Sequence, residues 1–172
     1  MKADARVPSE AQLSLLFSRQ AIAARVKELA KQISRVSSGV SPAYEGGIVK
    51  QTVMAEKGPA PAGPYSHAVV ANGFVFISGQ GPIDPETGTM PDAFADQVRQ
   101  TLENVRTVLE AAGSSLDDVV KVNAYVTDLT RFAEFNEVYK EFFEHDPPAR
   151  TTVAAALLGM LVEVDCIAAI SE

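Results

Sequence analysis

A single arginine opens an apolar strand near the C-terminal end of this chain. The segment Pro148-Ala149-Arg150-Thr151-Thr152-Val153 leads into small and aliphatic residues, and a second apolar run covers residues 161–170. A guanidinium keeps its charge at any ordinary pH, so it cannot sit in a core unless an anion meets it. This strand is therefore not an ordinary core strand, and Arg150 is a candidate clamp for a carboxylate.

The composition predicts one ordinary globular domain plus an appendage. The chain has 172 residues, of which 47% are hydrophobic and 22% are charged, and that is enough to bury one sizeable core. The formal net charge of −7 argues against an electrostatic grip on nucleic acid or on an anionic membrane. No apolar stretch approaches the roughly 20 residues that a membrane-spanning helix needs.

The cysteine and histidine content argues against a disulfide framework and against a metal site. Cys166 is the only cysteine and lies inside an apolar run, where it is most simply a small core residue. His67 and His145 have no cysteine or histidine partner at ligand spacing. We therefore expect a reducing compartment and a cytoplasmic location.

A boundary near residue 48 separates an extension from the domain. Residues 9–34 carry an apolar stripe at helical spacing, and the following stretch is rich in serine, glycine and proline. We predict an amphipathic helix and linker over residues 1–47 and a domain over residues 48–172. The origin of the extension stays open between a fusion and an organelle-targeting segment.

Periodicity within the domain predicts an α+β fold. Strands are expected over residues 48–54, 68–71, 74–80 and 119–127 and in two closing segments, and helices over residues 94–109 and 132–142 with Thr130 as cap. Asn72-Gly73 predicts a tight hairpin. Both helices should cover one face of the sheet.

The second face of the sheet is expected to be half polar. On the last strand, Val164 and Cys166 share one side, whereas Glu163, Asp165 and Ile167 share the other. In the strand over residues 119–127, Val120 belongs to the apolar alternation. A face that mixes carboxylates with aliphatic side chains suggests packing against neighbouring subunits.

Several motifs occur in the order found in one known family. They are Gly63-Pro64-Tyr65, Ile77-Ser78-Gly79-Gln80, Asn104-Val105, Phe135-Asn136-x-x-Tyr139, Pro148-Ala149-Arg150-Thr151-Thr152-Val153 and Val162-Glu163-Val164-Asp165-x-Ile167-Ala168. Through them, residues 58–172 resemble the RidA (YjgF/UK114) family of small reactive-intermediate deaminases.

The resemblance implies a chorismate-mutase-like protomer with a mixed sheet and two helices on one face. It implies a homotrimer whose sheets face a central barrel, with three clefts between subunits. The implied reaction is hydrolysis of 2-iminobutanoate and 2-iminopropanoate, which derive from enamines such as 2-aminoacrylate, to 2-oxo acids and ammonia. No cofactor is implied.

The resemblance also assigns roles to residues by motif position. Arg150 would bind the substrate carboxylate, and Glu163 would position the attacking water. The pocket would be lined by further polar groups, namely Tyr65, Ser78, Asn136 and the backbone amide of Gly79. Leu158-Gly159-Met160 replaces a longer Leu-Pro turn, which would shorten a hairpin expected to bring Arg150 and Glu163 together.

The residues alone leave alternatives open for this site. Arg150 could be a structural cation paired with Asp146 or Asp165. Glu163 could be an ordinary strand residue, with Asp165 as the rival carboxylate. Imine hydrolysis fits the set nevertheless, because it needs a bidentate anchor, a positioned water and one acid or base.

Two further function classes compete with the deaminase. A trimer that binds a small carboxylate without turnover would use the same cleft. A nuclease or translation inhibitor, an activity attributed to some relatives, is disfavoured by the acidic balance and by the absence of a basic or aromatic nucleic-acid surface.

Overall fold

The computed structural model describes Lys27 and residues 50–170. The chain divides into two compact units, Met1–Gly47 and Ile48–Glu172, and the account below concerns the second. The helix predicted over residues 9–34 and its linker lie outside the described residues, except for Lys27, which is helical and exposed.

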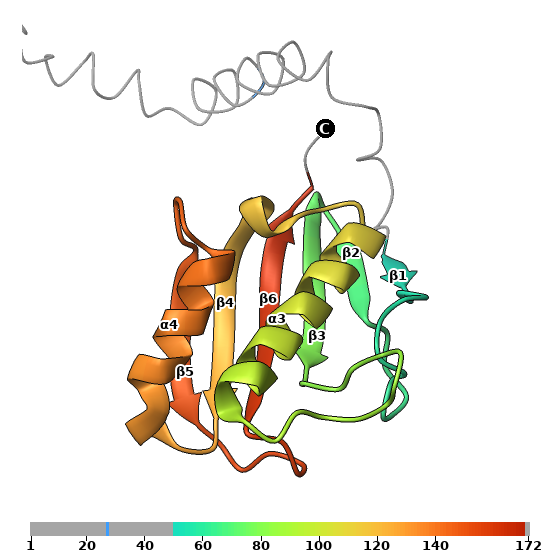
Figure 1. Cartoon of the computed structure of the whole chain (residues 1–172). Coiled ribbons are helices and arrows are strands. Elements are labelled where there is room, and N and C mark those ends of the chain that lie inside the picture. The colour runs from blue at the N-terminus through green and yellow to red at the C-terminus, as the bar shows by residue number, and fades with distance from the viewer. Residues whose placement is uncertain (1–26, 28–49, 171–172) are drawn as a thin grey trace, which may run out of the picture. The chain divides into compact units, whose positions relative to one another are not determined.

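A six-stranded mixed sheet forms the centre of the domain (Figure 1). Its strands are β1 (Gln51–Val53), β2 (Ala68–Ala71), β3 (Phe74–Gln80), β4 (Val119–Val126), β5 (Ala149–Ala154) and β6 (Val162–Ala169). Their order across the sheet is β1-β2-β3-β6-β4-β5, and every pairing is antiparallel except the parallel pair β4–β5. The C-terminal strand β6 therefore lies between β3 and β4.

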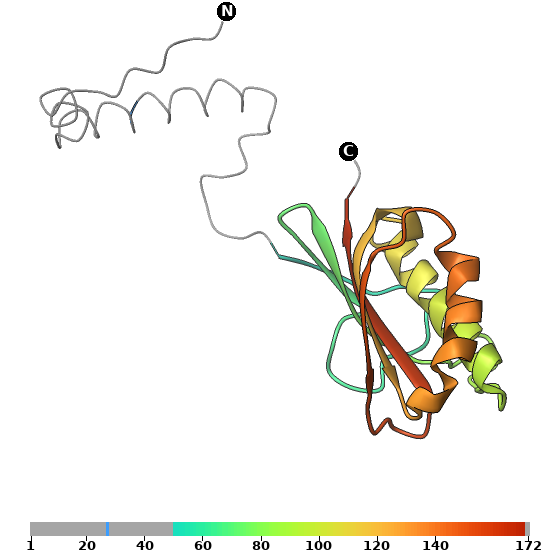
Figure 2. The same cartoon turned by 90° about the vertical axis from the view of Figure 1, so that its left-hand side faces the viewer.

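Two helices cover the same face of this sheet, as Figure 2 shows. They are α3 (Phe94–Ala111) and α4 (Phe132–Phe142), and single 3₁₀ turns, η2 (Leu116–Asp118) and η3 (Leu129–Arg131), lead into β4 and α4. The stripe of α3 that begins at Phe94 and includes Leu102 is buried, as expected for an amphipathic helix on a sheet. The predicted α+β class and the single covered face are confirmed.

The turn between β2 and β3 forms at the predicted dipeptide. Asn72 and Gly73 have φ values of 51° and 77°, and the flanking residues Ala71 and Phe74 are paired. Positive φ at both central positions defines the tight turn whose twist matches that of the strands. Local sequence therefore sets the register of this hairpin.

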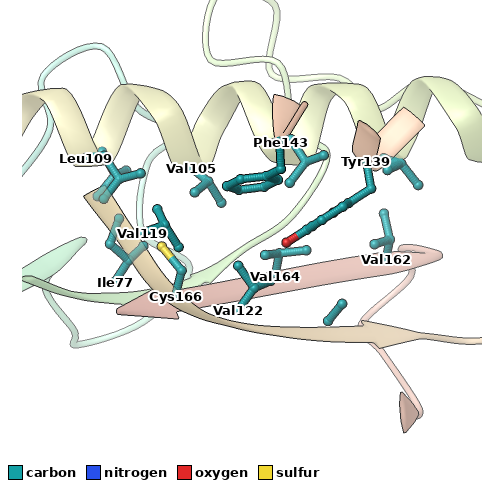
Figure 3. Packing of buried hydrophobic residues seen from close by; sticks show 14 of the residues in the cluster. Ile77, Val105, Leu109, Val119, Val122, Tyr139, Phe143, Val162, Val164 and Cys166 are labelled. Atoms are coloured by element: carbon teal, nitrogen blue, oxygen red, sulfur yellow. The ribbon is translucent and has the colours of Figure 1, made fainter. Parts of the chain in front are cut away.

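The core lies between the helices and the inward side chains of the central strands (Figure 3). Val122 comes from β4, and Val164 and Cys166 come from β6, while α4 contributes Tyr139 and Phe143. Burial raises the pKa of the Cys166 thiol to about 12. Since the thiolate is the reactive form, Cys166 acts as a small core residue, as predicted.

The alternation predicted for β4 breaks at one position. Val120 is 46% exposed, although the sequence pattern placed it with the buried Val122. The pairing of β4 with β6 shifts register between Val119 and Lys121, so one extra residue is accommodated there. A bulge of this kind changes which side a residue faces, and it corrects the prediction for Val120.

The predicted cap of α4 is also wrong. The side chain of Asp128, rather than that of Thr130, accepts a hydrogen bond from the Thr130 backbone N–H, at 2.9 Å. The capped element is the 3₁₀ turn η3, because the chain turns once more before α4 starts. An Asp in this position favours such a turn by the same hydrogen bond.

The face opposite the helices is open and half polar, as predicted. Its exposed apolar groups include Phe74, Phe76 and Val153. Asn123 and Tyr125 of β4 share this face, and their hydrogen bonds to Asp165 place that carboxylate there too. None of the described helices covers this side.

Matched substitutions on β4 test the register shift. We expect Val122→Ala to lower the free energy of unfolding by about 1–3 kcal/mol, because it removes buried methyl groups and leaves a cavity. Val120→Ala should change it by less than about 0.5 kcal/mol. Urea unfolding of both variants checks this, and equal losses would contradict the assigned register.

Candidate functional site

The predicted site residues fall into two separate clefts. The first, of about 350 Å³, lies beside the end of β3 and is lined by Tyr65, Ser78, Gly79 and Glu163. The second, of about 650 Å³, lies between α4 and β5 and is lined by Asn136 and Arg150. Each cleft carries one of the two charged groups that the sequence assigned to a single site.

A bulge in β3 makes room for Glu163 in the first cleft. The pairing of β3 with β6 shifts between Ile77 and Gln80, at Ser78 and Gly79. A Cβ atom built on Gly79 would collide with the Glu163 carboxyl group. Glycine is therefore required here for close approach of a side chain rather than for an unusual φ.

A second glycine of the same segment accommodates a methionine. A Cβ atom on Gly81 would lie 2.7 Å from Sδ of Met160, which lines the first cleft together with Leu158. Gly79 and Gly81 therefore admit one polar and one apolar side chain from the segment that enters β6. The carboxylate of this cleft has an apolar wall beside it.

Glu163 is half-buried, and no described residue donates a hydrogen bond to its carboxylate. Burial, and secondarily the charge of Asp165, raise the pKa of Glu163 above its ordinary value. Desolvation has this effect because it disfavours the charged form of a carboxyl group. A carboxylate without a partner in a cleft is available to a ligand or a water molecule.

Tyr65 and Ser78 are tied to the loop that borders the first cleft. The Tyr65 hydroxyl accepts a hydrogen bond from the Ala62 backbone N–H at 3.0 Å, and its side chain remains substantially exposed. The Ser78 hydroxyl donates to the Ser66 carbonyl at 2.8 Å. Tyr65 can therefore still donate its hydroxyl proton to a ligand, whereas Ser78 mainly joins this loop to β3.

His67 also holds this loop, although the sequence analysis gave it no specific role. Its ring is 3% exposed; Nδ1 accepts from the Ala55 backbone N–H at 2.9 Å, and Nε2 lies 2.7 Å from the Pro59 carbonyl. These partners assign the proton of the neutral ring to Nε2. The sequence contained no signal for this role, because both partners are backbone atoms of distant residues.

Arg150 lies on the helix side of β5 against aromatic rings. Its guanidinium carbon is 4.3 Å from the centre of the Tyr139 ring and slightly farther from those of Phe135 and Phe132. Nη2 donates to Oδ1 of Asn136 at 2.6 Å. The specific polar contact considered for Asn136 is therefore present.

No carboxylate of the described residues pairs with Arg150, and the suggested ion pairs with Asp146 and Asp165 do not form. The guanidinium has five N–H donors, and one of them is bound to Asn136. Stacking on aromatic faces holds the group without consuming the other donors. The remaining donors are suited to bind a carboxylate in a bidentate manner.

Within one chain, Arg150 and Glu163 do not meet. The sequence analysis expected a hairpin to bring them together, but β4 lies between β5 and β6. Arg150 is paired with Val122 and faces the helices, whereas Glu163 is paired with Tyr125 on the open face. The shortened segment around Gly159 therefore connects two strands that are not neighbours.

Two further properties limit the chemistry of the described residues. They contain no group of three His, Cys, Asp or Glu side chains that could hold a metal ion. None of their helices has the length and hydropathy needed to cross a membrane.

This fold and the motif residues define a family. The sequence model of the family described as Endoribonuclease L-PSP matches residues 55–170. The fold is also that of the crystal structure of RidA from the Antarctic bacterium Psychrobacter sp. PAMC 21119, with a TM-score of 0.67 and 43% identity over 70% of this chain and 99% of that one. The chain belongs to the RidA (YjgF) family.

Two further relatives are similar over the same part of the chain. A RutC family protein of Pyrococcus horikoshii is 47% identical over 70% of this chain and 98% of its own. TdcF of Escherichia coli, which bears the name of a reactive intermediate deaminase, is 41% identical over 70% and 97%. The crystal structure of TdcF with bound serine has a TM-score of 0.66, 40% identity and coverage of 70% and 99%.

Removal of the buried imidazole tests its structural role. We expect His67→Ala to lower the free energy of unfolding by about 2–4 kcal/mol, because two backbone groups lose their buried partner. His145→Ala is the control, since that side chain is 86% exposed and should contribute less than about 0.5 kcal/mol. Chemical denaturation provides the comparison, and similar values for both variants would refute the assignment.

Proposed function

We propose that this protein hydrolyses 2-imino acids to 2-oxo acids and ammonia as a homotrimer. The site would form where the Arg150 cleft of one copy faces the Glu163 cleft of the next. The observation that carries this proposal is that each charged group lacks a counter-ion among the described residues of its own chain. A substrate between two copies would meet both.

The chemistry of the two clefts suits an imino acid. Arg150 would bind the substrate carboxylate through its unused donors. Glu163 would accept a proton from water as the oxygen attacks the carbon of the C=N bond, while the nitrogen gains a proton. Glu163 would then return its proton to the nitrogen as the C–N bond breaks, so that imine and water give oxo acid and ammonia.

The required acceleration is modest. Free imines hydrolyse in water without help, so anchoring and one well-placed base are sufficient. The implied substrates are 2-iminobutanoate and 2-iminopropanoate, which arise from enamines such as 2-aminoacrylate. Leu158 and Met160, which line the Glu163 cleft, would face the aliphatic part of such substrates.

The open face of the sheet supports the trimeric assembly. Phe74, Phe76 and Val153 are each more than 40% exposed on this face. Large apolar groups that gather on one surface are typical of an interface between protein chains. Glu163 faces the same side, so association through this face would bring a neighbouring copy toward the first cleft.

Two relatives bear on the choice of ligand. TdcF carries the name of a reactive intermediate deaminase, and its structure was solved with bound serine, a small molecule with a carboxylate. A carboxylate-binding trimer without turnover is the main alternative for this chain. It would keep ligand binding but release no oxo acid.

The family description as an endoribonuclease supports a second candidate. The arginines Arg99, Arg106 and Arg131 each pair with a glutamate, and the net charge of the chain is negative. Such a surface provides few free cations for phosphates. Cleavage of RNA by the purified protein, insensitive to Arg150→Ala, would favour this candidate. The cytoplasmic location stays a prediction.

Coupled turnover tests the reaction. A threonine or serine dehydratase supplies the imine, and release of the 2-oxo acid is followed with and without this protein. We expect Arg150→Ala and Glu163→Gln to reduce the acceleration at least about 100-fold, equivalent to about 3 kcal/mol of lost anchoring or base catalysis. Absence of acceleration by the folded parent protein would disprove the deaminase.

Mixed assemblies test whether the site combines two copies. Arg150→Ala and Glu163→Gln chains, each inactive alone, are unfolded together and refolded in equal amounts. A site between copies should regain about a quarter of the parent activity, because a random neighbour supplies the missing group in one arrangement of four. A site within one chain would regain none.

Glycine substitutions test the position of the Glu163 carboxylate. Gly79→Ala should reduce turnover at least about 10-fold, because its methyl group displaces the carboxylate and small displacements are costly in catalysis. Gly63→Ala is the matched control in the same cleft, since its Cβ would be at an ordinary 3.5 Å from the Tyr65 ring. Equal activities in the coupled assay would contradict this role of Gly79.

A further inference from the structure

Asp165 lies next to Glu163 on the open face of β6 and is bound to β4. Nδ2 of Asn123 donates to Oδ1 of Asp165 at 2.7 Å, and the Tyr125 hydroxyl donates to Oδ2 at 3.0 Å. The strand register places Asn123 opposite Asp165 and Tyr125 opposite Glu163. Two neighbouring carboxyl groups therefore have different environments.

The two hydrogen bonds give Asp165 a defined charge and position. Each carboxylate oxygen accepts from a donor on β4, which favours the ionised form of Asp165. The hydrogen bond to Asp165 also raises the pKa of Tyr125, so Tyr125 remains a donor. Glu163 has no such donors among the described residues, and it lies two positions along the strand, about 7 Å away.

Asp165 is the charged group of the described residues that faces Glu163. From β3, the bulge at Ser78 and Gly79 brings no charge. From β4, Tyr125 is neutral, and the Lys121 amine lies farther along the strand and donates to Thr151 at 2.6 Å. From the cleft loop, the Tyr65 hydroxyl and both nitrogens of His67 are bound to backbone atoms.

We propose that Asp165, held by Asn123 and Tyr125, is a positioning residue that sets the proton affinity of the Glu163 carboxylate. This inference rests on the proposed function, in which Glu163 accepts a proton from the attacking water. A fixed negative charge behind Glu163 makes the uptake of that proton more favourable. A base with a pKa nearer the working pH removes a proton from water more effectively.

The substitution Asp165→Asn removes this charge and preserves the shape of the group. The asparagine oxygen can accept from Asn123 while its amide donates to the Tyr125 hydroxyl, so both contacts can be retained. Asp117→Asn is the control, because Asp117 is exposed in η2, which precedes the start of β4, whereas Glu163 pairs near the end of that strand. Both variants lose one negative charge.

Two measurements read the effect. The first is the pH profile of coupled turnover, whose acidic limb reports ionisation of the free enzyme's base. The second is titration of the carboxyl ¹³C resonance of Glu163 in protein labelled at glutamate, identified by its loss in Glu163→Gln. The second measurement requires no activity, so failure of the deaminase and failure of this inference give different results.

We expect Asp165→Asn to move both the acidic limb and the Glu163 titration to lower pH by about half a unit or more, given the separation of the two charges. Turnover at the plateau should fall about two- to threefold, since a weaker base is less effective. Asp117→Asn should leave both measurements unchanged. An unshifted Glu163 titration in folded Asp165→Asn, or an equal shift in Asp117→Asn, would overturn the inference.

Discussion

The pairing of β4 with β5 on one side and β6 on the other is the constraint on which the site depends. It places β4 between two strands that follow each other in the chain. Arg150 consequently faces the helices, whereas Glu163 and Asp165 face the open side. A single chain thus carries the anchor and the carboxylate apart, and the proposed assembly of several copies is what would join them.

Each half of the site is supported by a different physical interaction. Stacking on Tyr139 and one hydrogen bond from Asn136 hold Arg150 while leaving most of its donors unused. The Glu163 cleft depends instead on close backbone approach at Gly79 and on His67, which ties the bordering loop to itself. Rigid surroundings with unpartnered charges at their centre are suited to bind a polar ligand.

Much of the fold was predictable because its signals are local. The stripe of α3, the Asn72-Gly73 turn and the alternation of β6 each depend on residues within a few positions of one another. The errors arose where distant segments decide the outcome. Val120 faces solvent because of a bulge against β6, and the two closing strands are separated by β4.

The sequence by itself determined the family, the helices and strands, and the residue types of the candidate site, because these depend on local patterns and on the chemistry of Arg150 and Glu163. Only the tertiary structure decided which groups meet. It separated Arg150 from Glu163, gave both Asp165 oxygens donors from β4, and closed the loop around His67. Such contacts follow from strand order and register, which join residues far apart in the chain and leave no local signal.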